Sequence, residues 1–448
     1  MTATDLAPEF LEPLLDLLRI PSVSTGNAAR EPIDRAATFL RDFVRAAGGE
    51  AELVGRPDVN PLVVGWLGAN ANGGPSAKTV MIYGHYDVQG PEPLDEWETD
   101  PFVPTIKDGR IYARGASDDK GNFWPLLYEA CEMFRKGELP TNVRIVIEGE
   151  EETGGFNLIP WLEAYPHVEG EHCDACIIYD SGSIGTRPTI TIGARGVIAG
   201  NVSVRTADID LHSGVYGGTV PNALHVLMRA LAPILPLEDG RLPPSLRAGI
   251  DEIPQTERDM WDDMPKGERA ITRVGGRMLH PTSGERYYEM TGWEPSIDVN
   301  EIKAGDPRTV IPSKASAHVS MRLAPGQRNR DMIAELERLI TDALHPAAEV
   351  SFKWYGGVDA AGFSPEDPVL LAARKAYANA FGQQAALWRL GGTLPLLDVL
   401  KRKNISTVLT GFAGAGDKIH APNESYALES LSQGRIAARA LLQEFATL

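Results

Sequence analysis

Four short runs of apolar residues are the feature that most restricts the fold of this 448-residue chain. They lie at residues 62–67, 80–83, 143–147 and 176–179. Turns and stretches of helical periodicity separate them, and each run is apolar on both faces of a strand. Runs of this kind are typical of central strands in a sheet that helices cover on each side. We therefore predict an α/β fold.

Periodicity predicts further elements along the chain. Apolar side chains recur at helical spacing over residues 10–18 and 33–44, and Pro21 and Gly48 end these two helices. Later elements are strand 197–205, helix 222–234, strand 315–323, helix 331–344, strand 349–354, helix 368–381, strands 386–390 and 407–411, and helix 426–445. The Pro- and charge-rich residues 235–306 have no clear period, and we interpret them as an insertion.

The length of the chain predicts two domains, because 448 residues exceed what one hydrophobic core usually supports. The pattern of buried strands gives way near residue 193 to strands with more alternation, and it returns near residue 356. We predict that residues 1–192 and 356–448 form one domain. Residues 193–355 would form a smaller α+β domain inserted within it, with a sheet backed by two helices.

The charge of the chain argues against one class of partner. Its 61 acidic and 43 basic residues give a formal net charge of -18 at pH 7. Binding to phosphates requires a basic surface, so nucleic acid is not an expected partner. The first 20 residues lack a signal segment, no apolar run could span a bilayer, and three cysteines cannot form a disulfide framework. We expect a cytoplasmic protein with no membrane partner.

Histidines and acidic residues follow several of the predicted strands. His85 and Asp87 come directly after one apolar run, and their spacing of two points both to the same side. Asp180 ends another run, and His420 follows the last predicted strand. The carboxyl ends of strands in an open α/β sheet meet at one edge, where such sheets place their sites. We therefore expect these side chains to lie near one another.

Two acidic clusters extend this pattern. Asp118 and Asp119 precede a predicted helix, and one of them could simply cap that helix. Glu150, Glu151 and Glu152 follow a central apolar run, although three adjacent acids ordinarily belong on a solvated loop. At a strand end, one carboxylate could bind a metal ion while its neighbour serves as general base. Each signal alone is weak, whereas their agreement at one sheet edge indicates a metal site.

Three segments carry a resemblance to a known family: GHYDVQ at 84–89, RGASDDKG at 114–121 and LHSGVYGG at 211–218. From residue 20 to residue 424 the chain resembles the co-catalytic zinc peptidases, which include carnosinase, the cytosolic non-specific dipeptidases, aminoacylase, bacterial glutamate carboxypeptidase and succinyl-diaminopimelate desuccinylase. The third segment is most similar to the dipeptidase branch. The resemblance implies a mixed sheet flanked by helices, of the zinc-exopeptidase kind, an inserted lid or dimerisation domain, and a homodimer.

The resemblance also implies two divalent metal ions per subunit, with zinc first and manganese or cobalt as alternatives. The implied ligands are His85, Asp118 and Asp180 for one ion, and Asp118, Glu152 and His420 for the other. Glu151 would be the general base that takes a proton from the attacking water. Asp87 would fix the tautomer of His85. The peptide bond after the bridging Asp118 would be cis.

Further residues correspond to positions that contact the substrate in relatives. His212 would stabilise the developing oxyanion, and domain closure or a dimer partner must bring it to the metal ions. Arg322 would bind the substrate carboxylate, although without the family context a surface arginine is as good a reading. Thr309 and Thr393 correspond to other contacts. Leu390 departs from the family, because many dipeptidase relatives have glutamate at this position.

We predict a metallopeptidase that cleaves dipeptides or short peptides with a free C-terminal carboxylate. An N-acyl- or N-carbamoyl-amino-acid amidohydrolase is the alternative, because Leu390 removes an acid near the substrate. A non-catalytic binding protein is a further alternative, but such a protein should have lost ligands. We interpret Cys173 and Cys176 as buried apolar residues and not as a redox or zinc site. Ser213 lacks the Gly-x-Ser-x-Gly turn of a serine hydrolase.

Overall fold

The computed structural model describes residues 6–26, 28–71, 77–167, 171–184, 187–262, 264–273, 275–414 and 416–448. The chain divides into two compact units. Unit 1 comprises Met1–Ile192, Phe363–Leu387 and Val399–Leu448, and unit 2 comprises Gly193–Gly362 and Trp388–Asp398. The inserted domain was predicted to end at residue 355 (193–355), whereas this part of unit 2 continues to Gly362. The return of residues 388–398 to unit 2 was not predicted.

Two contacts account for these differences. The short strand β15 (Ala361–Gly362) pairs with residues 193 and 194, so the chain stays in unit 2 beyond residue 355. The half-buried Arg389 forms an ion pair with the buried Glu257 through two hydrogen bonds, which ties the segment around Arg389 to unit 2. Both contacts join residues far apart in sequence, so no local sequence pattern predicts them.

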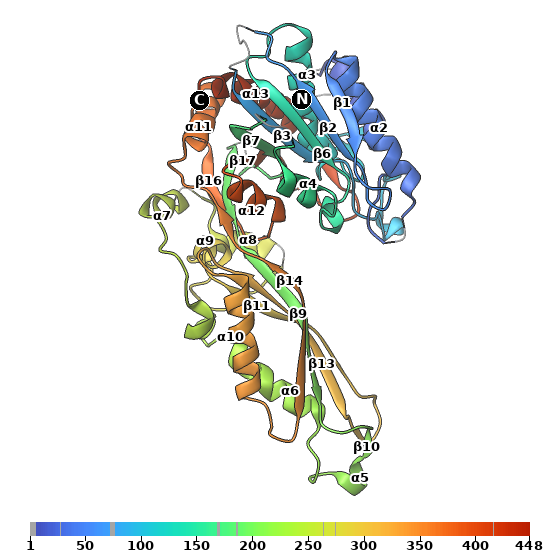
Figure 1. The fold of residues 1–448 in the computed structure, drawn as a ribbon, viewed down its shortest axis with the longest axis vertical. Coiled ribbons are helices and arrows are strands. Elements are labelled where there is room, and N and C mark those ends of the chain that lie inside the picture. The colour runs from blue at the N-terminus through green and yellow to red at the C-terminus, as the bar shows by residue number, and fades with distance from the viewer. Residues whose placement is uncertain are drawn as a thin grey trace. The chain divides into compact units, whose positions relative to one another are not determined.

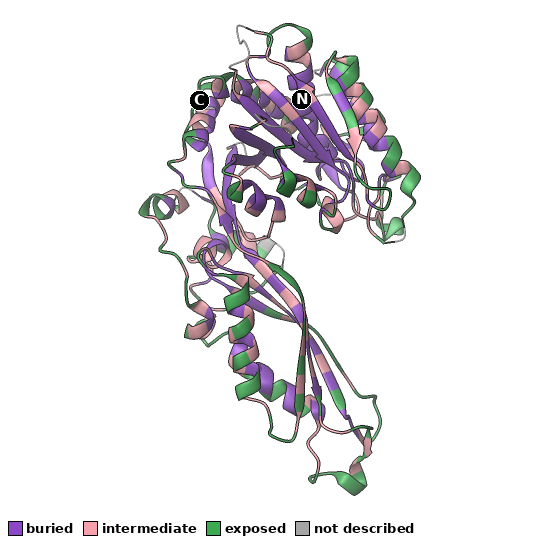
Figure 2. Ribbon diagram, viewed as in Figure 1, coloured by how far each residue is buried: buried purple, intermediate pink, exposed green. Residues whose placement is uncertain are grey.

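Unit 1 is built on a mixed sheet, most of whose strands are buried along most of their length (Figure 1 and Figure 2). Seven strands follow one another in the order β1 (Glu50–Val54), β2 (Leu62–Leu67), β6 (Asn142–Glu148), β3 (Thr79–His85), β7 (Ala175–Tyr179), β17 (Ser406–Gly411) and β8 (Thr189–Ala194). β3 is parallel to β6 and β7, and β17 is parallel to β7. The pairs β1–β2, β2–β6 and β17–β8 are antiparallel. The predicted α/β fold with a mixed sheet is confirmed.

Helices cover this sheet, which explains why its central strands are apolar on both faces. Every residue of β3 and of β7 is buried. The helices are α1 (Pro8–Leu18), α2 (Arg30–Ala46), α3 (Lys120–Arg135), α4 (Leu158–Ala164), α11 (Pro368–Phe381) and α13 (Leu428–Phe445), while α12 (Pro395–Arg402) begins in unit 2 and ends in unit 1. α2 packs on β1 and β2, α3 packs on β3 and β7, and α13 packs on α3 and α11. Among the described residues, no helix is both long and apolar enough to cross a membrane.

Smaller elements complete unit 1. The strands β18 (Ser425–Ala427), β5 (Arg110–Tyr112) and β4 (Thr105–Lys107) form a separate antiparallel sheet. Cys173 and Cys176 are buried and form no disulfide, and their burial raises the pKa of both thiols. This placement is the one expected of buried apolar residues.

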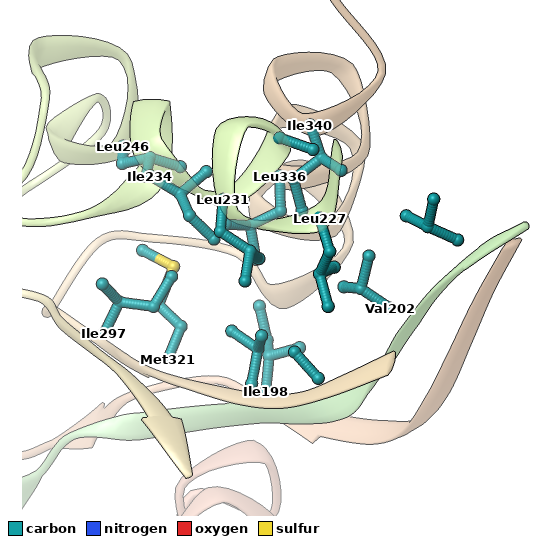
Figure 3. Packing of buried hydrophobic residues seen from close by; sticks show 14 of the residues in the cluster. Ile198, Val202, Leu227, Leu231, Ile234, Leu246, Ile297, Met321, Leu336 and Ile340 are labelled. Carbon is teal, nitrogen blue, oxygen red and sulfur yellow. The ribbon is translucent and has the colours of Figure 1, made fainter. Parts of the chain in front are cut away.

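Unit 2 contains an antiparallel sheet with one apolar face. Its strands follow the order β11 (Ser296–Ala304), β13 (Lys314–Leu323), β9 (Gly196–Arg205) and β14 (Glu349–Val358). Burial alternates along β9 and β13, as expected when only one face of a sheet is covered. The helices α6 (Ala223–Leu231) and α10 (Asn329–Asp342) cover that face. Figure 3 shows Leu227, Leu231 and Ile340 packed over Ile198 and Met321 of the strands.

The stretch 235–306 had no assigned elements, and its described residues hold three short α-helices, a turn of 3-10 helix at Pro244–Arg247 and β11. The helices are α7 (Gln255–Trp261), α8 (Gly267–Arg273) and α9 (Tyr287–Gly292). β11 is an edge strand, and most of its side chains are exposed or half-buried, so the alternation that marks a strand is weak. Beyond β9 the chain forms β10 (Leu211–His212), α5 (Ser213–Tyr216) and, before β13, β12 (Val310–Ile311).

Candidate metal centre

Five side chains from separate segments of unit 1 meet at one edge of its sheet. His85 is the last residue of β3, and Asp180 directly follows β7. Glu152 lies in a turn of 3-10 helix just after β6, and Asp118 lies just before α3. His420 is in the loop after β17. The parallel arrangement of these strands brings their carboxyl ends together, as expected for a site in an α/β sheet.

The distances divide these five residues into two groups that share one carboxylate. Asp118 Oδ1 lies 3.0 Å from His85 Nε2, and Asp118 Oδ2 lies 2.9 Å from His420 Nε2. His420 Nε2 is also 3.3 Å from Glu152 Oε2. The groups are His85, Asp118 and Asp180, and Asp118, Glu152 and His420; within each, the candidate ligand atoms all lie within 4.8 Å of one another. These are the two ligand sets that the resemblance implied.

The groups present at this edge fit a pair of divalent cations. Imidazole nitrogens and carboxylate oxygens suit zinc, manganese and cobalt alike. Glu152 Oε1 is buried and has no hydrogen-bond partner among the described residues. Buried polar atoms are seldom left unpaired, so this oxygen is an open ligand position. Asp119 Oδ1 is unpaired in the same way, while Asp119 Oδ2 accepts a hydrogen bond from the amide of His85.

The electrostatics of the cluster also favour bound cations. Burial raises the pKa of Asp180, and the charges of Asp118, Glu151 and Glu152 raise it further. Hydrogen bonds with Asp118 and Glu152 raise the pKa of His420 to about 10. Several carboxylates held in one buried place repel one another, and a cation between them removes that repulsion.

Glu151 and Glu150 are adjacent, but the structure gives them different surroundings. Burial raises the pKa of Glu151, and the charges of Asp118 and Glu152 add to this effect, although His85 opposes it. Glu150 instead accepts hydrogen bonds from the amides of Asn60 and Asn157, at 3.0 and 2.9 Å. Glu150 therefore holds loops together, while Glu151 lies beside the ligand cluster without belonging to either ligand group.

Asp87 is completely buried and connects the two sides of the cluster. Its Oδ1 lies 3.4 Å from His85 Nδ1 and accepts the amide of Glu151 at 3.3 Å. Its Oδ2 accepts the amide of Glu152 at 3.2 Å. One carboxylate thus contacts a candidate ligand on β3 and the backbone of the turn that carries Glu151 and Glu152.

Two further residues contribute to the cluster and were not predicted. Glu424 is buried and accepts hydrogen bonds from the amides of Ser117 and Asp118 and from the guanidinium of Arg114. Gln89 Nε2 donates to Glu152 Oε2 at 2.7 Å. Both lie inside segments of the family resemblance, which was the only available signal. The Asp118–Asp119 peptide bond is cis, as the resemblance implied.

The other four predicted site residues belong to unit 2, where they form two separate pairs. His212 and Thr309 are exposed and lie side by side, because His212 pairs with Val310 and the amide of Ser213 donates to the carbonyl of Thr309. Arg322 lies near the end of β13 and donates to Thr393 Oγ1 at 2.9 Å.

Comparison with known proteins places this geometry in context. The sequence profile of peptidase family M20/M25/M40 matches residues 81–444. The Cys-Gly metallodipeptidase dug1 of Schizosaccharomyces pombe is 27% identical over 448 residues, which cover 95% of this chain and 93% of the relative. The Beta-Ala-His dipeptidase of Homo sapiens is 28% identical over 458 residues, with coverage of 93% and 86%. The structure of the M20 metallo-carboxypeptidase Sso-CP2 from Sulfolobus solfataricus superposes on this chain with a TM-score of 0.85 and 26% sequence identity. The superposition covers 98% of this chain and 100% of that structure.

Proposed function

This chain belongs to peptidase family M20/M25/M40, and we propose that it hydrolyses the amide bond of dipeptides or short peptides with a free C-terminal carboxylate. The observation that carries this proposal is the convergence of two ligand groups that share Asp118, with Glu151 beside them. Its matched relatives include two enzymes named as dipeptidases. The amidohydrolase alternative is not favoured by these relatives.

We assign one ion to His85, Asp118 and Asp180 and the other to Asp118, Glu152 and His420, with zinc as the first choice and manganese or cobalt as alternatives. When bound, two divalent ions polarise the scissile carbonyl and lower the pKa of water. Glu151 accepts the proton of the attacking water and then delivers it to the leaving amine nitrogen. The raised pKa of Glu151, caused first by burial, suits a group that both accepts and returns a proton.

Asp87 prepares His85 for its role as a ligand. A metal ion binds a neutral imidazole through one nitrogen, and the other nitrogen must then carry the proton. His85 Nδ1 lies near both the carboxylate and the carbonyl oxygen of Asp87, at 3.4 and 3.1 Å. These acceptors hold the proton on Nδ1 and leave Nε2, the atom that faces Asp118, free for the metal ion.

Arg322 is our candidate for recognition of the substrate carboxylate. It has no carboxylate partner among the ion pairs of the described residues, and its hydrogen bond to Thr393 orients the guanidinium. A guanidinium matches a carboxylate with two parallel hydrogen bonds. Thr393 in turn donates to the carbonyl of Arg195 at 2.6 Å, so the pair is anchored to the backbone of unit 2.

The Arg322→Met variant should raise KM for a dipeptide about 10- to 150-fold with little change in kcat, because it removes hydrogen bonds to a charged group. Steady-state kinetics with a dipeptide and with its C-terminal amide measure this effect, and the amide should be little affected. Arg205→Met is the matched control, because Arg205 lies on the same sheet but pairs with Glu349. An equal loss for dipeptide and amide would contradict the assignment.

His212 and Thr309 form one pair in unit 2, and Arg322 and Thr393 form the other. The two pairs cannot contact the same small substrate within one chain. β13 has 10 residues, and at a rise of ~3.4 Å per residue its ends lie about 30 Å apart. Arg322 is near one end of β13. His212 is the last residue of β10, and β10 and α5 lie beyond the other end of β13 (Figure 1). A dipeptide spans only about 7 Å.

We therefore propose a homodimer in which His212 and Thr309 of one chain complete the site of the partner chain. In this arrangement His212 donates to the oxygen of the scissile carbonyl as negative charge develops on it. His212 Nδ1 accepts the amide of Gly214 at 3.0 Å, which places the ring proton on Nε2 and makes that atom the donor.

A substrate panel tests the proposed function. The metal-loaded protein should hydrolyse free dipeptides, including Cys-Gly and β-Ala-His, faster than N-acetyl- or N-carbamoyl-amino acids. Liberated amino acids are measured directly by chromatography. Turnover of the N-acyl compounds without turnover of any dipeptide would overturn the proposal. Leu390, where the family resemblance implies an acid in many dipeptidases, makes the amino side of the substrate the informative variable in this panel.

A further inference from the structure

Residues 20–25 form a segment that we call the N-terminal strap, which lies between α1 and α2 and runs beside the chain that leaves β3. Val23 and Val88 form a parallel β-bridge. The amide of Val88 donates to the carbonyl of Ser22 at 3.0 Å, and the amide of Ser24 donates to the carbonyl of Val88 at 3.3 Å. The strap therefore follows the residues around Asp87 closely, although it is more than 60 residues away in sequence.

Two serines of the strap make hydrogen bonds of equal length to different kinds of acceptor. The hydroxyl of Ser22 donates to the backbone carbonyl of Tyr86 at 2.6 Å. The hydroxyl of Ser24 donates to the side chain of Asp87, at Oδ2, also at 2.6 Å. Ser22 thus attaches the strap to the main chain, whereas Ser24 touches a carboxylate that contacts the metal centre.

The contacts of Asp87 show what the Ser24 hydroxyl adds. Among the described residues, the other groups that face its carboxylate are His85 Nδ1 and the amides of Glu151 and Glu152, which all belong to the centre itself. Their distances are 3.4, 3.3 and 3.2 Å, so the 2.6 Å hydrogen bond from Ser24 is the shortest of these four contacts. A buried carboxylate is stable in one orientation only when its oxygens are well paired.

The strap is itself held firmly at its beginning. Lys120 Nζ donates to the carbonyls of Leu17 and Ile20, at 3.1 and 2.7 Å. Lys120 is buried and lies two residues after the shared ligand Asp118. The carbonyls at the end of α1 are thereby tied to the segment that carries this ligand. Ser24 presents its hydroxyl from a backbone that is fixed at both ends, since Thr25 Oγ1 also accepts the amide of Gly90.

We propose that Ser24 is a positioning residue of the metal centre: its hydroxyl fixes the Asp87 carboxylate, and Asp87 then orients His85 and the Glu151–Glu152 turn. This inference rests on the proposed function, because it concerns the same two ions. Without the hydroxyl, the 3.2 Å bond from the amide of Glu152 is the one hydrogen bond that Asp87 Oδ2 retains from the described residues. The carboxylate can then turn, and His85 loses part of its orientation toward the metal ion. Residues that orient a metal ligand in this way typically contribute 10- to 100-fold, roughly, to metal affinity.

The test compares Ser24→Ala with Ser22→Ala, which removes an equally short hydrogen bond from the same strap. Metal-free protein is titrated with Zn²⁺ in competition with a chromophoric chelator, and melting temperatures of the metal-free variants, kcat and KM are measured alongside. We expect Ser24→Ala to weaken Zn²⁺ binding about 10- to 100-fold and to lower kcat with little change in KM. Ser22→Ala should lower the melting temperature similarly and keep wild-type Zn²⁺ affinity.

Two further variants show whether Ser24 acts through Asp87. Ser24→Thr keeps a hydroxyl and should recover most of the lost affinity. In an Asp87→Ala background, Ser24→Ala should have no additional effect on Zn²⁺ binding, because the side-chain acceptor of the Ser24 hydroxyl is gone. Equal Zn²⁺ affinities for the Ser24→Ala and Ser22→Ala variants would overturn this inference alone. Wild-type protein that binds none of Zn²⁺, Mn²⁺ and Co²⁺ would overturn the proposed function and this inference with it.

Discussion

Replacing Glu151 with glutamine should lower kcat for dipeptide hydrolysis about 10²- to 10⁴-fold while both metal ions stay bound. Glutamine has nearly the same shape as glutamate but cannot accept and return the proton. Glu151 lies outside both candidate ligand groups, so its loss should leave the metal affinity close to that of the wild type. Steady-state kinetics together with metal analysis of the same sample measure the two quantities.

The adjacent Glu150 provides the control for this variant. Its carboxylate accepts the amides of Asn60 and Asn157 and is not part of the centre. Glu150→Gln should therefore lower the melting temperature and keep kcat within a few-fold of the wild type. A Glu151→Gln variant with full activity would show that another group moves the proton.

Mixed dimers should regain activity that neither parent has. His212→Ala should lower kcat about 10²- to 10³-fold, the usual effect of removing one donor to a developing oxyanion. When the His212→Ala variant is co-expressed in equal amounts with the Glu151→Gln variant, random pairing in a symmetric dimer gives about a quarter of the wild-type activity. The mixed dimer holds one site with Glu151 from one chain and His212 from the other.

A second pair of variants gives the contrasting result. Glu151→Gln and Asp118→Asn damage the same unit, so every site in their mixed dimer carries one of the two changes. Their co-expression should yield no more activity than the two parents separately. If the His212→Ala and Glu151→Gln pair also fails to regain activity, His212 serves the site of its own chain or none.

His85, Asp180 and Glu152 could be predicted because each stands at or just after the end of a strand that the sequence marks clearly. β3 and β7 are buried at every residue, so their apolar runs end sharply at His85 and before Asp180. Parallel strands then bring those ends together whatever the details of the loops. The family resemblance added the pairing of ligands into two groups, which spacing alone could not give.

The residues that support the ligands could not be predicted in the same way. Ser24 and Glu424 are single polar residues in irregular segments, and their partners lie more than 60 and more than 300 residues away. Much of their bonding is to backbone amides and carbonyls, which any residue could supply. Only the folded chain brings these groups together, so no local pattern distinguishes Ser24 from Ser22.

The edge strand β11 and the return of residues 388–398 were missed for related reasons. β11 exposes most of its side chains, so it lacks the alternation by which β9 and β13 were found. Arg389 is held in unit 2 by Glu257 and by the ring of Trp293, 4.2 Å from its guanidinium carbon. These contacts join three separate segments, and their effect on the domain boundary follows only from tertiary structure.

Metal analysis of the Asp118→Asn variant tests the shared carboxylate directly. Wild-type protein loaded with Zn²⁺ and freed of excess should hold two ions per chain by elemental mass spectrometry. Asp180→Asn should lose one of them, because Asp180 belongs to a single group. Asp118→Asn should lose both, because its two oxygens face His85 and His420 separately. Two tightly bound ions in the Asp118→Asn variant would contradict a centre built around this residue.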